Sequence, residues 1–269
     1  CGCRCPDLRG TPRSQNVRTH RLSVAAGVRD FTGYRGSRLS SENRCLQKPI
    51  EIMSLKPYKN SVTQSWRTFW AAPGRRIELF FSFIILTSVM LSKLRFLQFN
   101  ETRAGRVLRD PLLNIFTPLD LSGLIFFLIY LGIICAIIVL LPHPGRILIG
   151  MQVYTVYAAL RMLAMFIVPL EPPEGIIPLT DPLMSWASTG VQMNKDLFFS
   201  GHTATMFILY LMLPPGRWRW VFLTGVFVMA TSLIIQRVHY SIDVIAAPFF
   251  CFGAHAFVLR MRKIAGLGM

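Results

Sequence analysis

The chain has 269 residues, of which 52% are hydrophobic and only 16% are charged. A soluble domain has about a quarter of charged residues, so this composition favours a membrane protein. The net charge of +16 would indicate nucleic-acid binding in a soluble protein. Here the basic residues lie mainly in the first third of the chain and between apolar runs, where membrane-flanking charge explains them. We therefore expect no nucleic-acid partner.

The first 52 residues are expected to lie outside the fold. They are rich in Arg, Ser and Gly, lack hydrophobic periodicity, and precede the first methionine, Met53. A transit-like presequence has this composition, but a disordered or non-native extension is the favoured interpretation. We expect residues 53–76 to form a cytoplasmic N-terminal segment and residues 264–269 a short tail.

Six apolar runs predict an all-α polytopic membrane protein, with a six-transmembrane-helix bundle over residues 77–263. A helix that spans a bilayer needs about 20 mostly apolar residues, and the fourth and sixth runs are marginal by this length. The runs are residues 77–94, 121–141, 147–168, 202–214, 220–236 and 243–259.

Lysine and arginine in the short loops set the expected orientation. Basic residues precede the first run, follow the sixth, and occupy the connections from the second run to the third and from the fourth to the fifth. These places share one side if all six runs span, so that side and both termini are expected to be cytoplasmic. The connection over residues 93–120 is also basic but lies on the opposite side. Its stretch "RVLRDPLLNIF" is consistent with an interfacial helix.

One group of polar residues on the non-cytoplasmic side is the stretch "QRVHYSIDV". His239 and Asp243 are four residues apart, a spacing that places them on one face of a helix. The carboxylate can hold one imidazole nitrogen and leave the other as a nucleophile or base. The alternative is a chance pair at a surface turn that helps to cap the sixth run.

A second polar group is the stretch "SGHT", residues 200–203, at the start of the fourth run. A helix N-terminus attracts anions, and Gly201 allows a close approach of the backbone. From the first turn, His202 could donate a proton to an oxygen that leaves a phosphate. An ordinary Ser200 cap beside a surface histidine is the alternative.

Arg161 is the third polar feature, about two helical turns below the outer end of the third run. A cation inside a membrane helix costs roughly 2.5–3.5 kcal/mol at the centre and is a candidate functional residue. Its alternative is a side chain that extends to the membrane surface. Three features on one membrane face, each suited to phosphate, favour a common site.

The cysteines indicate neither a disulfide framework nor a metal site. Of the six, three are crowded at the N-terminus, and no histidine or second CxxC pair follows them at a useful spacing. We expect no metal and no cofactor.

The motif "SGHT", followed later in the chain by "HYSID", resembles the two histidine motifs of the type 2 phosphatidic acid phosphatase superfamily. The most similar branch is the sphingomyelin synthase-like one. "DLFFSGHT", with Asp196 six residues before the histidine, and "RMLAMFIVPLEPP" are similar to further motifs of that branch. The resemblance covers residues 53–263 and implies the six-helix membrane fold of that superfamily.

The resemblance also implies a mechanism without metal. His239 would attack phosphorus and form a phosphohistidine, while Asp243 would orient and charge it. His202 would protonate the leaving oxygen and then take a proton from the incoming water or alcohol. The residues expected to bind the substrate phosphate are Arg161, Ser200, Gly201 and Asp196.

Two departures from the superfamily pattern bear on the substrate. Val168 and Leu233 stand where the wider superfamily has arginines. The sphingomyelin synthase-like branch lacks both arginines as well. One strong guanidinium suits a singly charged phosphodiester headgroup better than a monoester, and Arg237 and Lys195 could supplement it. The expected partner is a membrane phospholipid, with ceramide or diacylglycerol as acceptor. The loop "PLEPPEGIIPLTDPL" is unlike the sphingomyelin synthases, so headgroup and acceptor do not transfer.

A different class of function is the alternative: a non-catalytic lipid-binding or transport protein that retains the fold. The discriminating observation is spatial. Catalysis requires His202, His239 and Asp243 to converge, either directly or around one phosphate.

Overall fold

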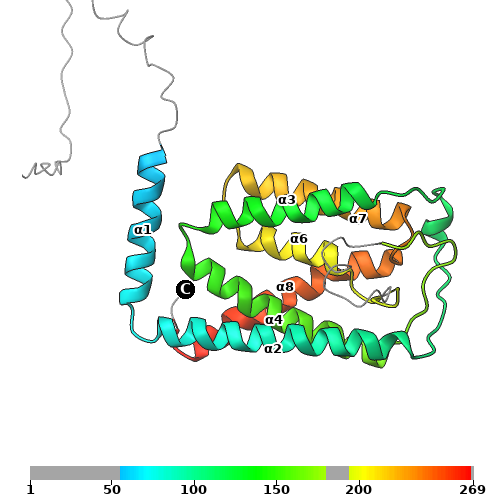
Figure 1. The fold of residues 1–269 in the computed structure, drawn as a ribbon, viewed down its shortest axis with the longest axis horizontal. Coiled ribbons are helices and arrows are strands. Elements are labelled where there is room, and N and C mark those ends of the chain that lie inside the picture. Colours follow the sequence, from blue (N-terminus) through cyan, green and yellow to red (C-terminus); the bar gives the residue numbers. More distant parts are fainter. Residues whose placement is uncertain (1–54, 180–193, 268–269) are drawn as a thin grey trace, which may run out of the picture. The chain divides into compact units, whose positions relative to one another are not determined.

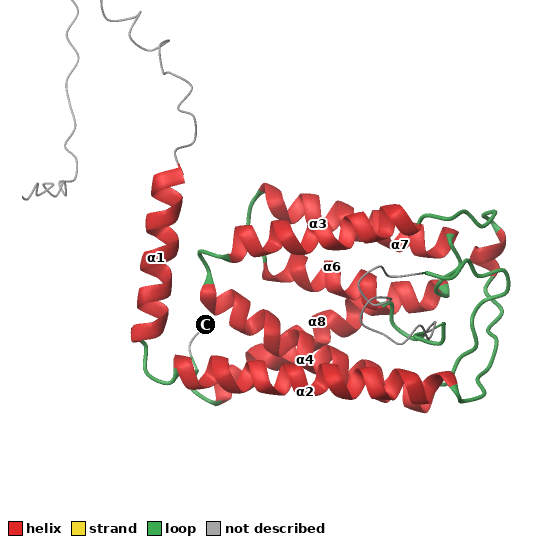
Figure 2. Cartoon of the chain, in the orientation of Figure 1, coloured by secondary structure: helices red, strands yellow, loops and turns green. Residues whose placement is uncertain are grey.

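A computed structural model describes residues 55–179 and 194–267, so the expectations for residues 1–52 concern a segment outside the described residues. Helices form the architecture of the described part (Figures 1 and 2). They are α1 (Leu55–Ala71), α2 (Arg75–Glu101), the short 3-10 helix η2 (Pro111–Asn114), α3 (Ser122–Leu140), α4 (Pro144–Ile167), α6 (Gly201–Met212), α7 (Arg217–Ile235) and α8 (Ser241–Ile264). The described residues form no strand beyond one isolated bridge, so the all-α prediction is confirmed for them.

Five of these helices, α2, α3, α4, α7 and α8, are long and apolar enough to cross a membrane. They support the prediction of a multi-pass integral membrane protein. The fourth apolar run instead forms α6, which has only 12 residues and rises about 18 Å. A full crossing needs about 20 residues, so the structure does not confirm six complete spans.

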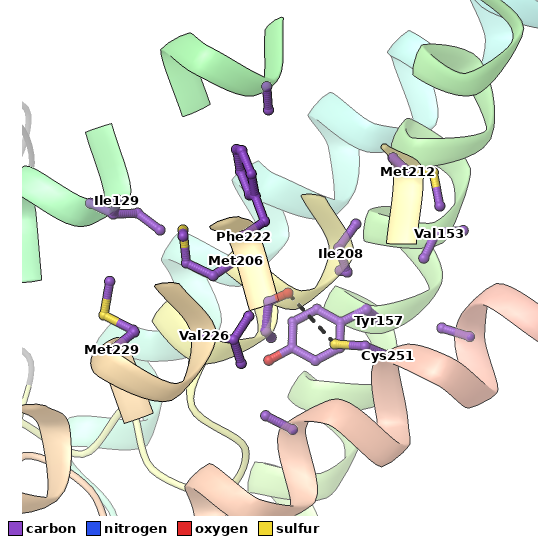
Figure 3. Packing of buried hydrophobic residues seen from close by; sticks show 14 of the residues in the cluster. Ile129, Val153, Tyr157, Met206, Ile208, Met212, Phe222, Val226, Met229 and Cys251 are labelled. Carbon is purple, nitrogen blue, oxygen red and sulfur yellow. Dashed lines mark hydrogen bonds between the residues drawn. The ribbon is translucent and has the colours of Figure 1, made fainter. Parts of the chain in front are cut away.

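The short α6 lies inside the bundle, where it contacts α3, α4, α7 and α8. Met206 of α6 lies against two glycines, Gly132 of α3 and Gly225 of α7. A Cβ atom at these glycines would come within 2.8 and 2.9 Å of the Met206 side chain. Small residues therefore let the helices approach closely, as is common in membrane bundles. Figure 3 shows Met206 in this core, between Ile129 and Val226.

The helices alternate in direction (Figure 1). The starts of α2 and α4 and the end of α8 lie at one end of the bundle, beside α1. The starts of α3, α6 and α8 lie at the other end, which carries the two histidine motifs. This arrangement brings together the segments from which the sequence predicts a site.

The connection from α2 to α3 differs from the sequence prediction. α2 continues to Glu101. Residues 102–121 then form no α-helix and contain only the four-residue 3-10 helix η2, so the interfacial helix is absent. Arg103 gives one physical reason for basic residues at this end. It donates to the carbonyl oxygen of Phe166 (3.0 Å) and approaches that of Met165 (3.4 Å) in the last turn of α4, where a cation is favourable.

Candidate functional site

The "HYSID" stretch forms the start of α8. Tyr240 is the N-cap residue, and its backbone N–H donates to Oδ2 of Asp243 in the first turn (3.3 Å). His239 lies just before the helix, with Nδ1 3.5 Å from the same Oδ2, and both side chains are almost fully buried. This contact has ion-pair distance but not hydrogen-bond geometry, and catalytic hydrogen bonds often tighten only with substrate bound.

The "SGHT" stretch begins α6, and a backbone hydrogen bond joins it to "HYSID". Ser200 is the N-cap residue of α6, and its hydroxyl accepts from the backbone N–H of Thr203 (3.3 Å). The backbone N–H of Ser200 donates to the carbonyl oxygen of Asp243 (3.1 Å). His202, in the first turn of α6, is half-buried and packs edge-on against Phe126. The two histidine motifs are thus held side by side.

Arg161 is buried at the same place, with 1% of its side chain exposed. Its Nε donates to the carbonyl oxygen of Phe199 (2.7 Å), while Nη1 and Nη2 donate to the Asp196 carboxylate (3.1 Å) and to the Asp196 carbonyl (3.0 Å). The side chain therefore turns into the bundle and does not extend to the membrane surface. Residues 196–199 wrap around the guanidinium and compensate the buried charge.

The Asp196 carboxylate forms an ion pair with the Arg161 guanidinium. Burial acts to raise the pKa of Asp196, but the Arg161 guanidinium, with smaller contributions from Lys93 and the imidazoles of His239 and His202, lowers it to about 2. The carboxylate therefore stays ionised at neutral pH.

The backbone before "SGHT" is strained. Phe198 and Phe199 both have positive φ angles, 70° and 63°, in the left-handed region that costs an L-residue roughly 1–2 kcal/mol. Strain of this kind persists where surrounding contacts hold it, often at functional sites. Here it directs the Phe199 carbonyl toward Arg161, and the bond to Nε (2.7 Å) offsets part of the cost.

Gly201 is required by a close approach to Arg161. A Cβ atom at Gly201 would lie 2.7 Å from Nη1 of Arg161, closer than side-chain carbon atoms come to a neighbour. The sequence predicts that this glycine admits a ligand, whereas in the structure it admits the guanidinium beside the first turn of α6. Arg161 and the positive end of the α6 dipole therefore face the same point.

The shortness of α6 places this point below the end of the bundle. Arg161 lies six residues before the last residue of α4, Ile167, which corresponds to about 9 Å along the helix. Gly201 touches the guanidinium of Arg161, so α6 begins beside that group, and residues 194–200 lead to it. A site here is recessed from the surface yet lies near one end of the bundle.

Loops that sequence reasoning did not connect to the site also hold it. Oδ2 of Asp110 accepts from the backbone N–H (2.6 Å) and the hydroxyl (2.7 Å) of Ser241, the first residue of α8. The Tyr240 hydroxyl donates to the carbonyl oxygen of Glu171 (2.9 Å) and accepts from the N–H of Leu108 (3.2 Å). These partners are far apart in the sequence, so no local pattern indicates them.

The two basic residues expected to supplement the site have structural contacts. Lys195 pairs with Glu171 (2.8 Å) and donates to the Arg103 carbonyl (2.7 Å). The Arg237 guanidinium donates to carbonyl oxygens of the neighbouring loops, among them those of Glu174 and Leu113 (both 3.1 Å). In the described structure both side chains tie loops together at this end of the bundle.

This geometry defines a class of protein, a multi-helix membrane protein with a histidine–carboxylate pair and a buried arginine at one end. Residues 195–260 match the family model described as PAP2 superfamily C-terminal. The match contains both histidine motifs and supports the PAP2 superfamily, whose members are generally phosphatases; it therefore supports an enzyme of lipid phosphoesters. Comparisons with curated proteins and with solved structures gave no significant match.

The Arg161–Asp196 pair leads to a stability prediction. We expect Asp196→Ala to destabilise the protein by about 2 kcal/mol, because it leaves the buried Arg161 charge without its carboxylate. This loss is smaller than for a fully buried ion pair, because 32% of the Asp196 side chain is exposed. Thermal unfolding of the detergent-solubilised chain measures the effect. The double variant Arg161→Leu/Asp196→Ala should be more stable than Asp196→Ala alone; a double variant that is less stable would contradict the charge explanation.

Proposed function

We propose that the chain is a membrane enzyme that transfers or hydrolyses phospholipid headgroups through a phosphohistidine, in the manner of the sphingomyelin synthase-like branch. The observation that carries the proposal is the junction of the two motifs. The Ser200 N–H bonds to the Asp243 carbonyl, His239 lies beside the Asp243 carboxylate, and Arg161 touches Gly201. A histidine pair, an orienting carboxylate and an arginine at a helix start together suit phosphoryl chemistry.

The proposed reaction has two steps. In the first, a nitrogen of His239 attacks phosphorus, and the bond from phosphorus to the diacylglycerol oxygen breaks as His202 gives that oxygen its proton. In the second, the hydroxyl of water or of an acceptor alcohol gives its proton to His202 and attacks phosphorus. The bond to His239 then breaks and the nitrogen regains its electron pair. Asp243 stabilises the positive charge that develops on His239.

The charges of the site favour a phosphodiester with a single negative charge. Among the described residues, Arg161 supplies the buried guanidinium of the site, and it is already paired with the Asp196 carboxylate. Leu233 is fully buried in the core, and Val168 ends α4, so neither position supplies the further arginine of the wider superfamily pattern. The carboxylates of the site would repel a doubly charged phosphomonoester, and one guanidinium would offset too little of that repulsion. A zwitterionic phospholipid headgroup fits this balance better.

Incubation of the purified protein with headgroup-labelled phospholipid tests this function. Ceramide or diacylglycerol is added in parallel reactions. Labelled sphingolipid or exchanged glycerolipid indicates transfer, whereas water-soluble headgroup phosphate alone indicates hydrolysis and would refute the transferase version. No turnover of any lipid would favour the non-catalytic lipid-binding alternative.

Asp110 is expected to act as a positioning residue in this reaction. Asp110→Ala removes both hydrogen bonds to Ser241 and frees the first turn of α8, which carries Asp243. We expect kcat to fall about tenfold while KM changes little, because small misplacements of catalytic groups are costly. Asp110→Asn should restore part of the rate.

Asp120 is the matched control, because its carboxylate lies in the same connection and accepts from the backbone N–H of Ser122 at the start of α3 (2.9 Å). An equal loss in Asp120→Ala would show a general loop effect instead.

A further inference from the structure

A cavity of about 830 Å³ lies at the opposite end of the bundle, between α1 and the start of α4. On the α1 side, hydroxyl and amide groups line it: Asn60, Ser61, Gln64, Ser65 and Thr68. Phe69 and Ala72 add an apolar wall, while Arg75, Pro144 and Gly145 complete the lining. The cavity shares no residue with the histidine site and stands outside the proposed reaction.

Two hydrogen bonds, one from a tyrosine and one from a tryptophan, fix α1 in place beside this cavity. The Tyr58 hydroxyl donates to the carbonyl oxygen of Ile138, and Nε1 of Trp66 donates to that of Leu141 (2.9 Å). Both acceptors lie at the end of α3, where helix carbonyls lack partners within the helix. α1 is thus anchored to the bundle, and the polar side chains that line the cavity are held in a defined place.

The charge around the cavity suits an anion. The helix α1 that lines the cavity contains basic residues and no acidic residue, and Arg75 of the lining pairs with Glu78. Gly145 is in the first turn of α4, whose N-cap residue His143 makes no side-chain cap, so the positive end of that helix dipole also faces this region. Lys59, Arg67 and Arg76 are exposed, and each is next to a lining residue in the sequence.

The depth of the cavity suits a lipid headgroup. Arg75 and Pro144 are the first residues of two helices long enough to cross a membrane, α2 and α4, so the cavity lies at the level where such helices leave the bilayer. The polar side chains of the lining can contact a lipid headgroup, and the apolar wall can contact the part of the lipid next to its acyl chains. Basic residues at this level attract anionic lipids.

We propose that the cavity between α1 and the start of α4 binds the headgroup of an anionic phospholipid, in the leaflet opposite the histidine site. The occupant is a phosphodiester whose headgroup carries hydroxyl groups that the α1 side chains can bind. Glycerophosphoglycerol carries the same phosphodiester and hydroxyl groups without the acyl chains, so it distinguishes a lipid from a soluble phosphate.

Gly145 offers a variant that fills the cavity, because a Cβ atom there meets no neighbour within 4 Å. Gly145→Leu is compared with Gly253→Leu in α8, where a Cβ atom is equally unobstructed but the cavity is distant. The dissociation constant of dioctanoyl phosphatidylglycerol is measured on the full chain in detergent. All variants carry His239→Ala, so that lipid turnover does not interfere.

We expect Gly145→Leu to weaken binding of phosphatidylglycerol at least about tenfold, a loss of about 1.4 kcal/mol, while Gly253→Leu leaves it unchanged. Dioctanoyl phosphatidylcholine and glycerophosphoglycerol should bind at least about tenfold more weakly to the parent. Unchanged binding in Gly145→Leu, or equal binding of phosphatidylcholine or glycerophosphoglycerol, would overturn the proposal. If Gly145→Leu does not fold, Ser61→Ala/Gln64→Leu gives the same test, with Thr63→Val on the same helix as its control.

Discussion

His239→Ala is expected to abolish turnover, with a loss of about 10⁴-fold or more, because catalytic groups that act as a unit fail together. His239 is the only proposed group that forms a bond to phosphorus, and Asp243 beside it cannot replace a nitrogen nucleophile. The variant should also take up no label from headgroup-labelled phospholipid, whereas the parent chain should carry a covalent headgroup phosphate. Turnover and protein labelling are measured on the same purified samples.

Folding must be controlled in this experiment, because only 3% of His239 is exposed. His239→Ala therefore also removes packing. His239→Gln fills more of the space, and His255→Ala changes another histidine farther along α8. The proposal predicts an inactive, unlabelled His239→Gln and an active His255→Ala. Label on His239→Gln would show that another residue is the nucleophile.

Apolar patterning predicts the long helices well, because a bilayer leaves few other ways to satisfy the backbone. The expected run 121–141 became α3 (Ser122–Leu140), and the run 220–236 became α7 (Arg217–Ile235). Helix ends were less predictable, since polar residues extend α2 to Glu101 beyond the apolar run. The short run 202–214 became α6 (Gly201–Met212), whereas the close contact of Gly201 with Arg161 could not be predicted from the run itself.

The same distinction holds for the site. Motif spacing predicts the neighbourhood of His239 and Asp243, since residues four apart at a helix start are close in most geometries. The partner of Arg161 follows from tertiary structure, because Asp196 reaches it through the left-handed turn at Phe198 and Phe199. The bond from Asp110 to Ser241 joins segments 131 residues apart, and no local preference indicates such a contact.

His202→Ala is expected to lose activity in a way that depends on the leaving group. A diacylglycerol oxygen leaves poorly unless it is protonated, so the variant should turn over phospholipid about 10²- to 10⁴-fold more slowly. A nitrophenyl phosphodiester needs no proton to leave, so its first step should slow by less than about tenfold. The burst of nitrophenol in a rapid-mixing experiment measures this step separately from the slow release of the headgroup from His239.

The comparison separates acid catalysis from other roles that the position of His202 permits. His202 packs against Phe126 at the start of α6, so its removal could also disturb the packing of the site. A packing defect would slow both substrates equally, and the burst would shrink together with lipid turnover.

Phe126→Leu is the matched control, since it alters the same contact but leaves the imidazole. It should show no dependence on the leaving group, whereas His202→Ala should show a steep one. A nitrophenol burst that falls in His202→Ala as far as lipid turnover does would assign His202 a structural role, and the leaving oxygen would then need a different proton donor.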